Sequence, residues 1–199
     1  MTTSRDLLIV AMDRGAERPV EEGDLSLALA GAEMADLLGA EAVRLEGDRI
    51  VPADRPAPAD PLLAAAFAEL VRGAPHESLA DWLWRRGRGL AAVYGATLET
   101  EGQLVRERRR FRVGSPAPAD TPDRRRAVDR WNSGDPVLAA LAEAAGIPGE
   151  RTGDAPDVAD DAVAAVLAAT NDAVLELGSV RQRRAIDEAA FDNIWRGGV

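Results

Sequence analysis

Residues 24–51 read DLSLALAGAEMADLLGAEAVRLEGDRIV, and this stretch decides the fold. Apolar residues recur mostly at helical spacing over Asp24–Ala40, and Asp24 is of a residue type that caps helix starts. In Val43–Val51 the apolar residues instead alternate along two short arms, joined by Gly47-Asp48, a pair that suits a tight turn. The stretch therefore predicts a long helix followed by a small β-hairpin.

Residue types that cap the first turn of a helix mark four further helix starts. They are Asp60-Pro61, Ser78-Leu79-Ala80-Asp81, Thr121-Pro122 and Asp135-Pro136. The other predicted elements are a short buried strand or first helical turn at Leu7–Met12, a helix at Leu90–Glu101, a hairpin at Leu104–Val113, a loop at Gly114–Ala119, and two helices at Asp157–Leu175 and Arg181–Trp195. The sequence thus predicts a mainly α protein, a compact helical bundle with two small β-hairpins and about eight helices.

The length of the chain fits one domain, or one domain with an appended helical tail. With 199 residues, 46% of them apolar, it is long enough to bury a core without disulfides or metal. We expect residues 1–146 to form a helical domain, 147–156 a loop, and 157–199 helices packed on the same domain. The apolar stretches Leu7–Val10 and Leu62–Val71 are too short to cross a membrane, so we expect a cytoplasmic protein, or one bound peripherally at the inner membrane face.

Charge is distributed unevenly along the chain. All 24 basic residues are Arg and the net charge is -10, which argues against a general nucleic-acid binder. Between Trp82 and Arg130, however, twelve Arg stand against six acidic residues, a local balance of +6. Such an asymmetry is typical of an interaction face on an otherwise acidic body.

Three Arg clusters in this region are candidate binding sites. They are Trp84 with Arg85, Arg86 and Arg88; Arg106, Arg108, Arg110 and Arg112 on the second hairpin; and Arg124, Arg125, Arg126 and Arg130 at a helix start. The first cluster mixes an indole with cations, which suits an anionic and apolar surface. In the second cluster, alternate residues of a strand share one face. The alternatives are that these arginines are merely solvated, interact with helix ends, or protect an exposed strand edge.

No residue pattern favours an enzyme. His76 is the only histidine, there is no Cys, and no Gly-rich phosphate loop, GxSxG or dinucleotide motif occurs. We therefore expect no catalytic residue, metal ligand or cofactor, and a protein that works by binding. The Arg clusters point to an anionic phospholipid surface or an acidic protein. A winged-helix-like contact with nucleic acid and a self-associating scaffold are the alternatives.

The order of several short motifs resembles the Golgi phosphoprotein 3-like family, in its actinobacterial rather than its eukaryotic form. The motifs are Asp6–Asp13, Leu29–Leu37, Asp60–Leu63, Ser78–Trp82 and Asp135–Leu141. The likeness covers about residues 5–146 and implies a mostly helical bundle with small hairpins. The family's eukaryotic members bind phosphatidylinositol 4-phosphate on Golgi membranes and recruit glycosyltransferase tails.

The lipid pocket of those eukaryotic proteins uses a Trp, an Arg on the early helix, and two basic residues one turn apart on a later helix. The resemblance places these positions at Glu21, Ala30, Arg88 and Ala91, so only Arg88 retains a cation. A phosphomonoester needs several converging cations or amide donors to offset its desolvation. We therefore expect a peripheral binding protein that does not recognise phosphatidylinositol 4-phosphate specifically.

Overall fold

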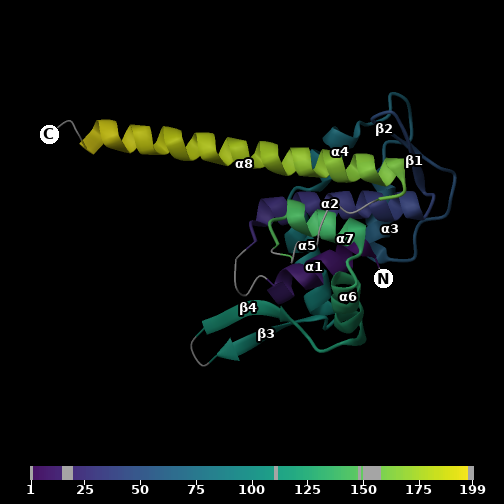
Figure 1. Ribbon diagram of the computed structural model, residues 1–199, viewed down its shortest axis with the longest axis horizontal. Coiled ribbons are helices and arrows are strands. Elements are labelled where there is room, and N and C mark those ends of the chain that lie inside the picture. The colour runs from purple at the N-terminus through teal and green to yellow at the C-terminus, as the bar shows by residue number, and fades with distance from the viewer. Residues whose placement is uncertain (1, 15–19, 110–111, 148, 150–157, 197–199) are drawn as a thin grey trace.

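The computed structural model describes residues 2–14, 20–109, 112–147, 149 and 158–196, without the side chains of 106–109, 112–116 and 189–196. In this part of the chain it shows eight helices and two antiparallel two-stranded sheets (Figure 1), which confirms the predicted fold class. The helices are α1 (Thr3–Arg14), α2 (Glu22–Gly39), α3 (Pro61–Ala68), α4 (Leu79–Arg86), α5 (Leu90–Thr100), α6 (Pro122–Asn132), α7 (Pro136–Ala144) and α8 (Asp161–Arg196). The strands are β1 (Val43–Glu46), β2 (Arg49–Pro52), β3 (Leu104–Arg109) and β4 (Arg112–Pro118).

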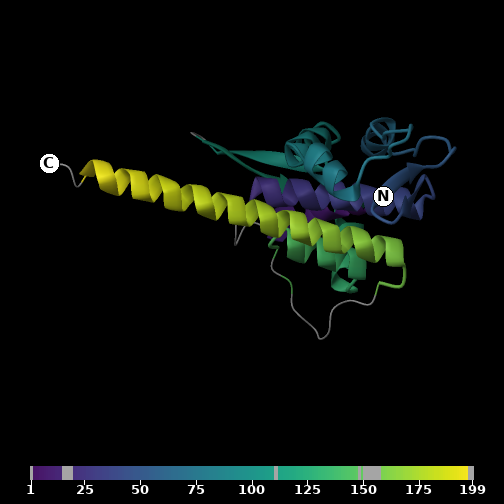
Figure 2. The same ribbon diagram turned by 90° about the horizontal axis from the view of Figure 1, so that it is seen from above.

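Helix α2 forms the centre of the bundle because it is apolar on nearly all sides. Leu25, Leu27, Leu29, Met34 and Leu37 are buried together with most of the small residues between them. A helix of this kind is stable only when other elements cover it. Helices α1, α3, α4, α5, α7 and α8 all pack against α2. Seen from above (Figure 2), α4 and α5 lie on one side of α2, and α7 and α8 lie on the other.

The N-terminal segment is helical throughout, as α1, and not a short strand. The predicted element at Leu7–Met12 was ambiguous because a run of consecutive apolar residues has no period that separates a strand from a buried helix. The helix begins earlier, at Thr3, where the backbone N–H groups of Thr3 and Ser4 donate to the carboxylate of Asp36 on α2 (3.0 and 3.3 Å). This cap lies 33 positions away along the chain, so the local sequence does not reveal it.

The four predicted caps are confirmed, and the fifth is wrong. Asp60, Ser78, Thr121 and Asp135 each accept a hydrogen bond from a backbone N–H in the first turn of the following helix. Helix α2 instead begins at Glu22, ahead of Asp24, which was predicted to cap it. The Asp24 carboxylate in the first turn forms an ion pair with Arg181 of α8. A long-range partner therefore takes the side chain that local reasoning assigned to the cap.

Both hairpins form, although the second is longer than predicted. Strands β1 and β2 pair from Val43↔Pro52 to Glu46↔Arg49, and Gly47 in the turn has a φ of 62°. In the second hairpin, β4 extends to Pro118 and pairs there with Leu104 of β3. The predicted loop at Gly114–Ala119 is therefore wrong over most of its length, because the β3 backbone provides hydrogen-bonding partners that the Gly- and Pro-containing sequence does not indicate.

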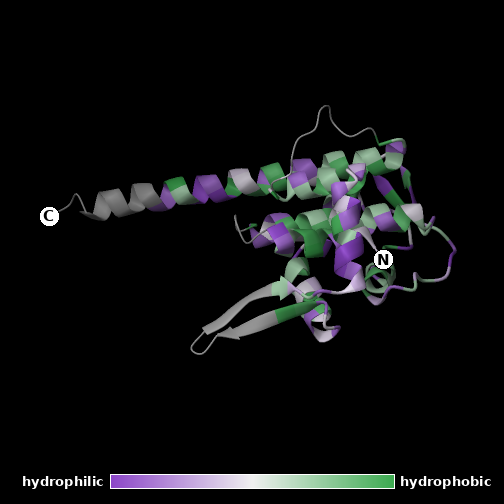
Figure 3. Cartoon of the chain, turned by 60° about the horizontal axis from the view of Figure 1, so that its bottom comes forward, coloured by the Kyte–Doolittle hydropathy of each residue, from purple (hydrophilic) through white to green (hydrophobic). Residues whose placement is uncertain are grey.

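The two predicted C-terminal helices are one continuous helix, α8, of 36 residues. A mid-helix glycine such as Gly178 costs only about 1 kcal/mol relative to Ala, and packing of α8 on α2, α4 and α7 outweighs it. Figure 3 shows apolar residues concentrated in the part of α8 that lies over the bundle. Residues 182–188 are exposed, and α8 extends well past the end of the bundle (Figure 1).

Helix α8 also has the length and hydropathy of a membrane-crossing helix over Asp161–Glu188, with 22% of its most apolar window buried. The expectation that the apolar stretches are too short to cross a membrane rested on Leu7–Val10 and Leu62–Val71, and α8 is an additional candidate. A core helix of a water-soluble bundle meets the same criteria. In this structure α8 contributes Val166, Thr170 and Ala173 to the core, so it is a packed helix of the bundle.

Candidate functional site

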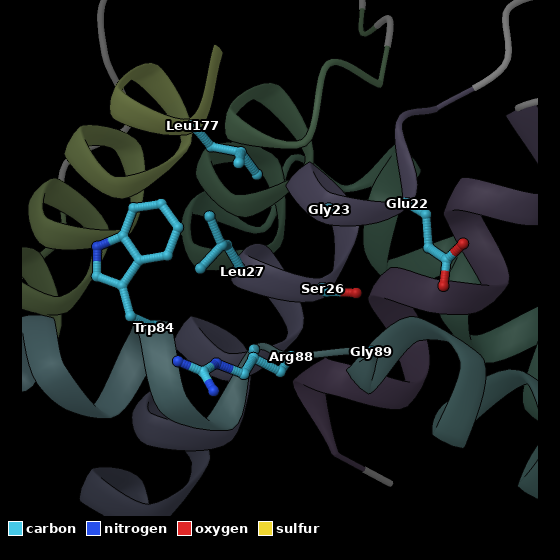
Figure 4. A pocket seen from close by; sticks show the side chains of 9 residues that line it. Glu22, Gly23, Ser26, Leu27, Trp84, Arg88, Gly89 and Leu177 are labelled. Carbon is cyan, nitrogen blue, oxygen red and sulfur yellow. The ribbon is translucent and has the colours of Figure 1, made fainter. Parts of the chain in front are cut away.

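A pocket of about 350 Å³ lies where α2, the α4–α5 junction and α8 meet (Figure 4). Its lining residues are Glu22, Gly23, Ser26, Leu27, Trp84, Gly87, Arg88, Gly89 and Leu177. The volume falls at the small end of the roughly 300–1,000 Å³ that is typical of ligand pockets. The pocket combines apolar walls with one carboxylate, one guanidinium and one hydroxyl, so it can bind a small amphipathic group.

Glycines create the pocket by letting helices approach closely and by turning the chain. A Cβ on Gly87 would lie 2.6 Å from the Leu83 carbonyl oxygen and 3.0 Å from Leu27 Cδ2, so a larger residue cannot sit there without a shift. Gly89 then adopts a φ of 66°, which favours glycine and starts α5 in a new direction. This turn places Arg88 at the corner between α4 and α5.

Two of the predicted site residues, Arg85 and Arg86, form ion pairs with carboxylates of the same protein. Arg85 pairs with Glu77 at 2.7 Å, and its guanidinium lies 5.2 Å from the ring centroid of Trp82. Arg86 is nearly buried and forms a two-point ion pair with Glu33, with both N–O distances at 2.8 Å. These two arginines therefore help to hold α4 in place, and carboxylates of the same protein compensate their charges.

Arg88 differs from both, because it has neither an ion-pair nor a hydrogen-bond partner among the described residues. Its side chain is exposed, and it lines the pocket together with Trp84. Next to it, the hydroxyl of Ser26 accepts a hydrogen bond from the Ala91 N–H at 3.1 Å in the first turn of α5. Of the first cluster, the structure therefore places Trp84 and Arg88 at one site and directs Arg85 and Arg86 elsewhere.

The arginines of the third cluster are paired with carboxylates of the same protein. Their five ion pairs are Arg124 with Asp13, Arg125 with Asp120, Arg126 with Asp123, and Arg130 with both Asp6 and Asp135. Arg130 connects α6 to the N-terminal helix, since Asp6 lies on α1. Arg124 and Arg130 therefore link α6 to α1, whereas Arg125 and Arg126 pair with acidic residues at the start of α6 itself.

The second cluster lies on the hairpin formed by β3 and β4, and the structure describes only part of this hairpin. Arg110 lies outside the described residues, and so do the side chains of Arg106, Arg108 and Arg112. In the backbone register Arg109 is opposite Arg112, so the arginines are shared between two antiparallel strands and do not follow one strand. Whether they form one cationic face stays a prediction.

Comparison with known protein families identifies the family to which the chain belongs. The family model described as Golgi phosphoprotein 3 (GPP34) matches residues 4–189. The chain belongs to the Golgi phosphoprotein 3 family. The match extends beyond the range of about residues 5–146 over which the sequence resembled that family, and it includes most of α8. A search of curated proteins finds no significant match.

The four positions at which the Golgi phosphoprotein 3 resemblance placed the eukaryotic lipid pocket lie in different environments. Ala30 is fully buried in α2, and Ala91 is mostly buried at the start of α5. Glu21 is exposed and forms an ion pair with Arg181 at 3.4 Å. Arg88 alone of the four both carries a positive charge and lines the pocket.

Sequence reasoning missed most of the pocket of this Golgi phosphoprotein 3 member. Glu22 and Ser26 belong to the first turns of α2, and Leu177 comes from α8, far along the chain. The local signal for the site is the sequence Gly87-Arg88-Gly89. Two glycines so close together favour a turn, and a turn here places the cation of Arg88 between two helices. No local signal connects Leu177 to that reversal.

Proposed function

We propose that this protein is a non-enzymatic, peripheral phospholipid-binding protein that docks on an anionic membrane surface through Arg88 and the hairpin of β3 and β4. The observation that carries the proposal is the exposed guanidinium of Arg88, which has no partner within the described part of the chain and lies beside the indole of Trp84 in a small pocket. An indole next to a cation suits the boundary between headgroups and acyl chains. Family membership agrees with a binding role of this kind.

The arrangement of the elements supports docking by one end of the bundle. The pocket is built from the first turns of α2, and the hairpin and the free part of α8 both extend past that same end (Figures 1 and 2). The chain segment of the hairpin contains five arginines between Arg106 and Arg112. Long-range attraction to an anionic surface acts on such a segment without a fixed geometry, so binding should weaken as salt increases.

The charge of the pocket favours a phosphodiester over a phosphomonoester. A phosphodiester carries one negative charge, which Arg88 can match, whereas a phosphomonoester at neutral pH carries nearly two. Among the described residues, the pocket offers no second cation to match that extra charge. We therefore infer that the specificity for phosphatidylinositol 4-phosphate seen in eukaryotic relatives is lost, and that the protein acts in the cytoplasm at the inner membrane face.

The test is the partition of the full chain onto phosphatidylcholine vesicles with and without phosphatidylglycerol, at about 50 mM and about 300 mM salt. A basic residue near an anionic surface contributes about 1 kcal/mol, so Arg88→Gln should lower the partition coefficient about fivefold. Arg44→Gln is the matched control, because Arg44 is exposed on β1 and already paired with Glu46. Binding that is equal at both salt concentrations, or absent at both, would refute the proposal.

A further inference from the structure

Two residues of opposite charge line the same pocket without pairing with each other. Glu22 and Arg88 both line it, both are exposed, and neither has an ion-pair partner among the residues that the structure describes. We propose that the pocket binds a zwitterionic headgroup, the ethanolamine phosphate of phosphatidylethanolamine, with its phosphate on Arg88 and its ammonium on Glu22. This inference rests on the proposed function and names the lipid that the pocket selects.

The neighbouring charges show that unpaired groups are unusual in this region. The acidic residues on either side of Glu22 along the chain, Glu21 and Asp24, both form ion pairs with Arg181. On the other side of the pocket, Arg85 and Arg86 form ion pairs as well. The ion pairs around the pocket thus leave one negative and one positive group for a ligand.

The pocket separates its two charged groups. In the view of Figure 4, Trp84, Leu27 and Leu177 lie toward one side, the guanidinium of Arg88 points toward that same side, and the carboxylate of Glu22 lies on the other. In a phosphatidylethanolamine molecule the phosphate likewise adjoins the apolar portion, and the ammonium group lies farther from it. The apolar wall suits a lipid better than a soluble headgroup, because a free headgroup has no apolar portion to bury.

The chemistry of the ammonium group favours ethanolamine over choline. A primary ammonium has three N–H donors, which can hydrogen-bond to the carboxylate of Glu22. A trimethylammonium group has no donor and is typically bound in a cage of several aromatic rings. The pocket contains one aromatic side chain, that of Trp84, among its lining residues.

The test compares vesicles that carry the same fraction of phosphatidylglycerol, with the remainder either phosphatidylethanolamine or phosphatidylcholine. The wild-type chain should prefer the phosphatidylethanolamine vesicles by about fivefold, as expected for one partly exposed ionic contact. Glu22→Gln should abolish that preference and leave binding to phosphatidylglycerol in phosphatidylcholine intact. Glu46→Gln is the control with the same change of charge, since Glu46 lies on β1 and its carboxylate is exposed.

The outcomes separate this inference from the proposed function. Binding to phosphatidylglycerol vesicles without a preference for phosphatidylethanolamine overturns the inference and leaves the proposed function standing. If Glu22→Gln still prefers phosphatidylethanolamine vesicles, the preference comes from the packing of the bilayer, and the inference is overturned. Glycerophosphoethanolamine that binds the protein without vesicles, as tightly as the membrane lipid does, would assign a soluble ligand in place of the lipid. Failure to bind any vesicle overturns both proposals.

Discussion

The substitution Arg86→Met tests whether the first Arg cluster is structural or exposed for binding. Arg86 is 9% exposed at its side chain, and Glu33, its partner, is fully buried. Tyr94 adds a contact, since its hydroxyl lies 3.0 Å from Glu33 Oε1. Methionine fills a similar volume without the charge, so the substitution leaves the carboxylate of Glu33 buried without its cation.

The expected loss is large because a buried charge loses its partner. Removing one member of a buried ion pair typically costs about 3–5 kcal/mol, compared with about 0–1 kcal/mol for an exposed pair. At about 2–4 °C per kcal/mol for a chain of this length, the melting temperature should fall by roughly 10 °C. The double variant Glu33→Met, Arg86→Met removes both charges and should recover most of the loss, since well-packed apolar replacements of buried ion pairs are often neutral.

The loss of stability in Arg86→Met should depend on pH. Burial raises the pKa of Glu33 above its usual value, and Arg86 opposes that effect. Without Arg86 the pKa rises further, so the folded protein takes up a proton at a higher pH than the unfolded chain does. The destabilisation should therefore be largest near neutral pH and should decrease as the pH falls.

Chemical denaturation of the two variants and of the wild type measures these differences. Arg44→Met serves as the control, because it breaks the ion pair with Glu46, in which both side chains are more than half exposed. A loss for Arg86→Met no larger than that of the control, and independent of pH, would refute the assignment of Arg86 to the core. The vesicle partition of folded Arg86→Met should equal that of the wild type.

Three further predictions concern the same fold. The raised pKa of Glu33 makes its contribution to stability increase as the pH falls. The free energy of unfolding of the wild type relative to Glu33→Gln should therefore increase as the pH is lowered from neutral, and a constant difference in denaturation experiments would contradict this. Gly31→Ala should destabilise the protein by about 1–3 kcal/mol, because the added Cβ would lie 2.2 Å from Thr170 Oγ1 of α8. Gly95 has open space around it, so Gly95→Ala should stabilise α5 by about 0.5–1 kcal/mol. Thermal unfolding of both variants distinguishes the two effects. A chain ending after residue 184 should keep the melting temperature of the full chain, since residues 185–188 are exposed, and a marked decrease would show that this part of α8 packs elsewhere.

Local sequence was sufficient where a structural feature depends on residues close together in the chain. The caps at Asp60, Ser78, Thr121 and Asp135 each bond to a backbone N–H two or three residues away, so the sequence alone shows both partners. The first hairpin was predictable for the same reason, because its turn residues and alternating arms are contiguous. The family resemblance also came from short motifs in order.

Distant partners explain the predictions that failed. The start of α1 depends on Asp36, and the first turn of α2 uses Asp24 for Arg181 of α8, 157 positions away. Arg86 pairs with Glu33, 53 positions away along the chain. The sequence therefore indicated an unpaired cation, although the folded protein pairs it with a buried carboxylate. Hydrophobic periodicity and charge counts cannot predict such contacts, because they depend on residue type and on neighbours in the sequence, and not on the distant residue with which a side chain pairs.

The amino-acid sequence by itself determined the helical class, the position of most helix starts, the first hairpin and the family. Tertiary structure alone decided which of the arginines remain free and which chain segments surround Arg88. The physical reason is that a helix start is stabilised by hydrogen bonds within one turn, whereas a pocket and a buried ion pair require segments that only packing around α2 brings together.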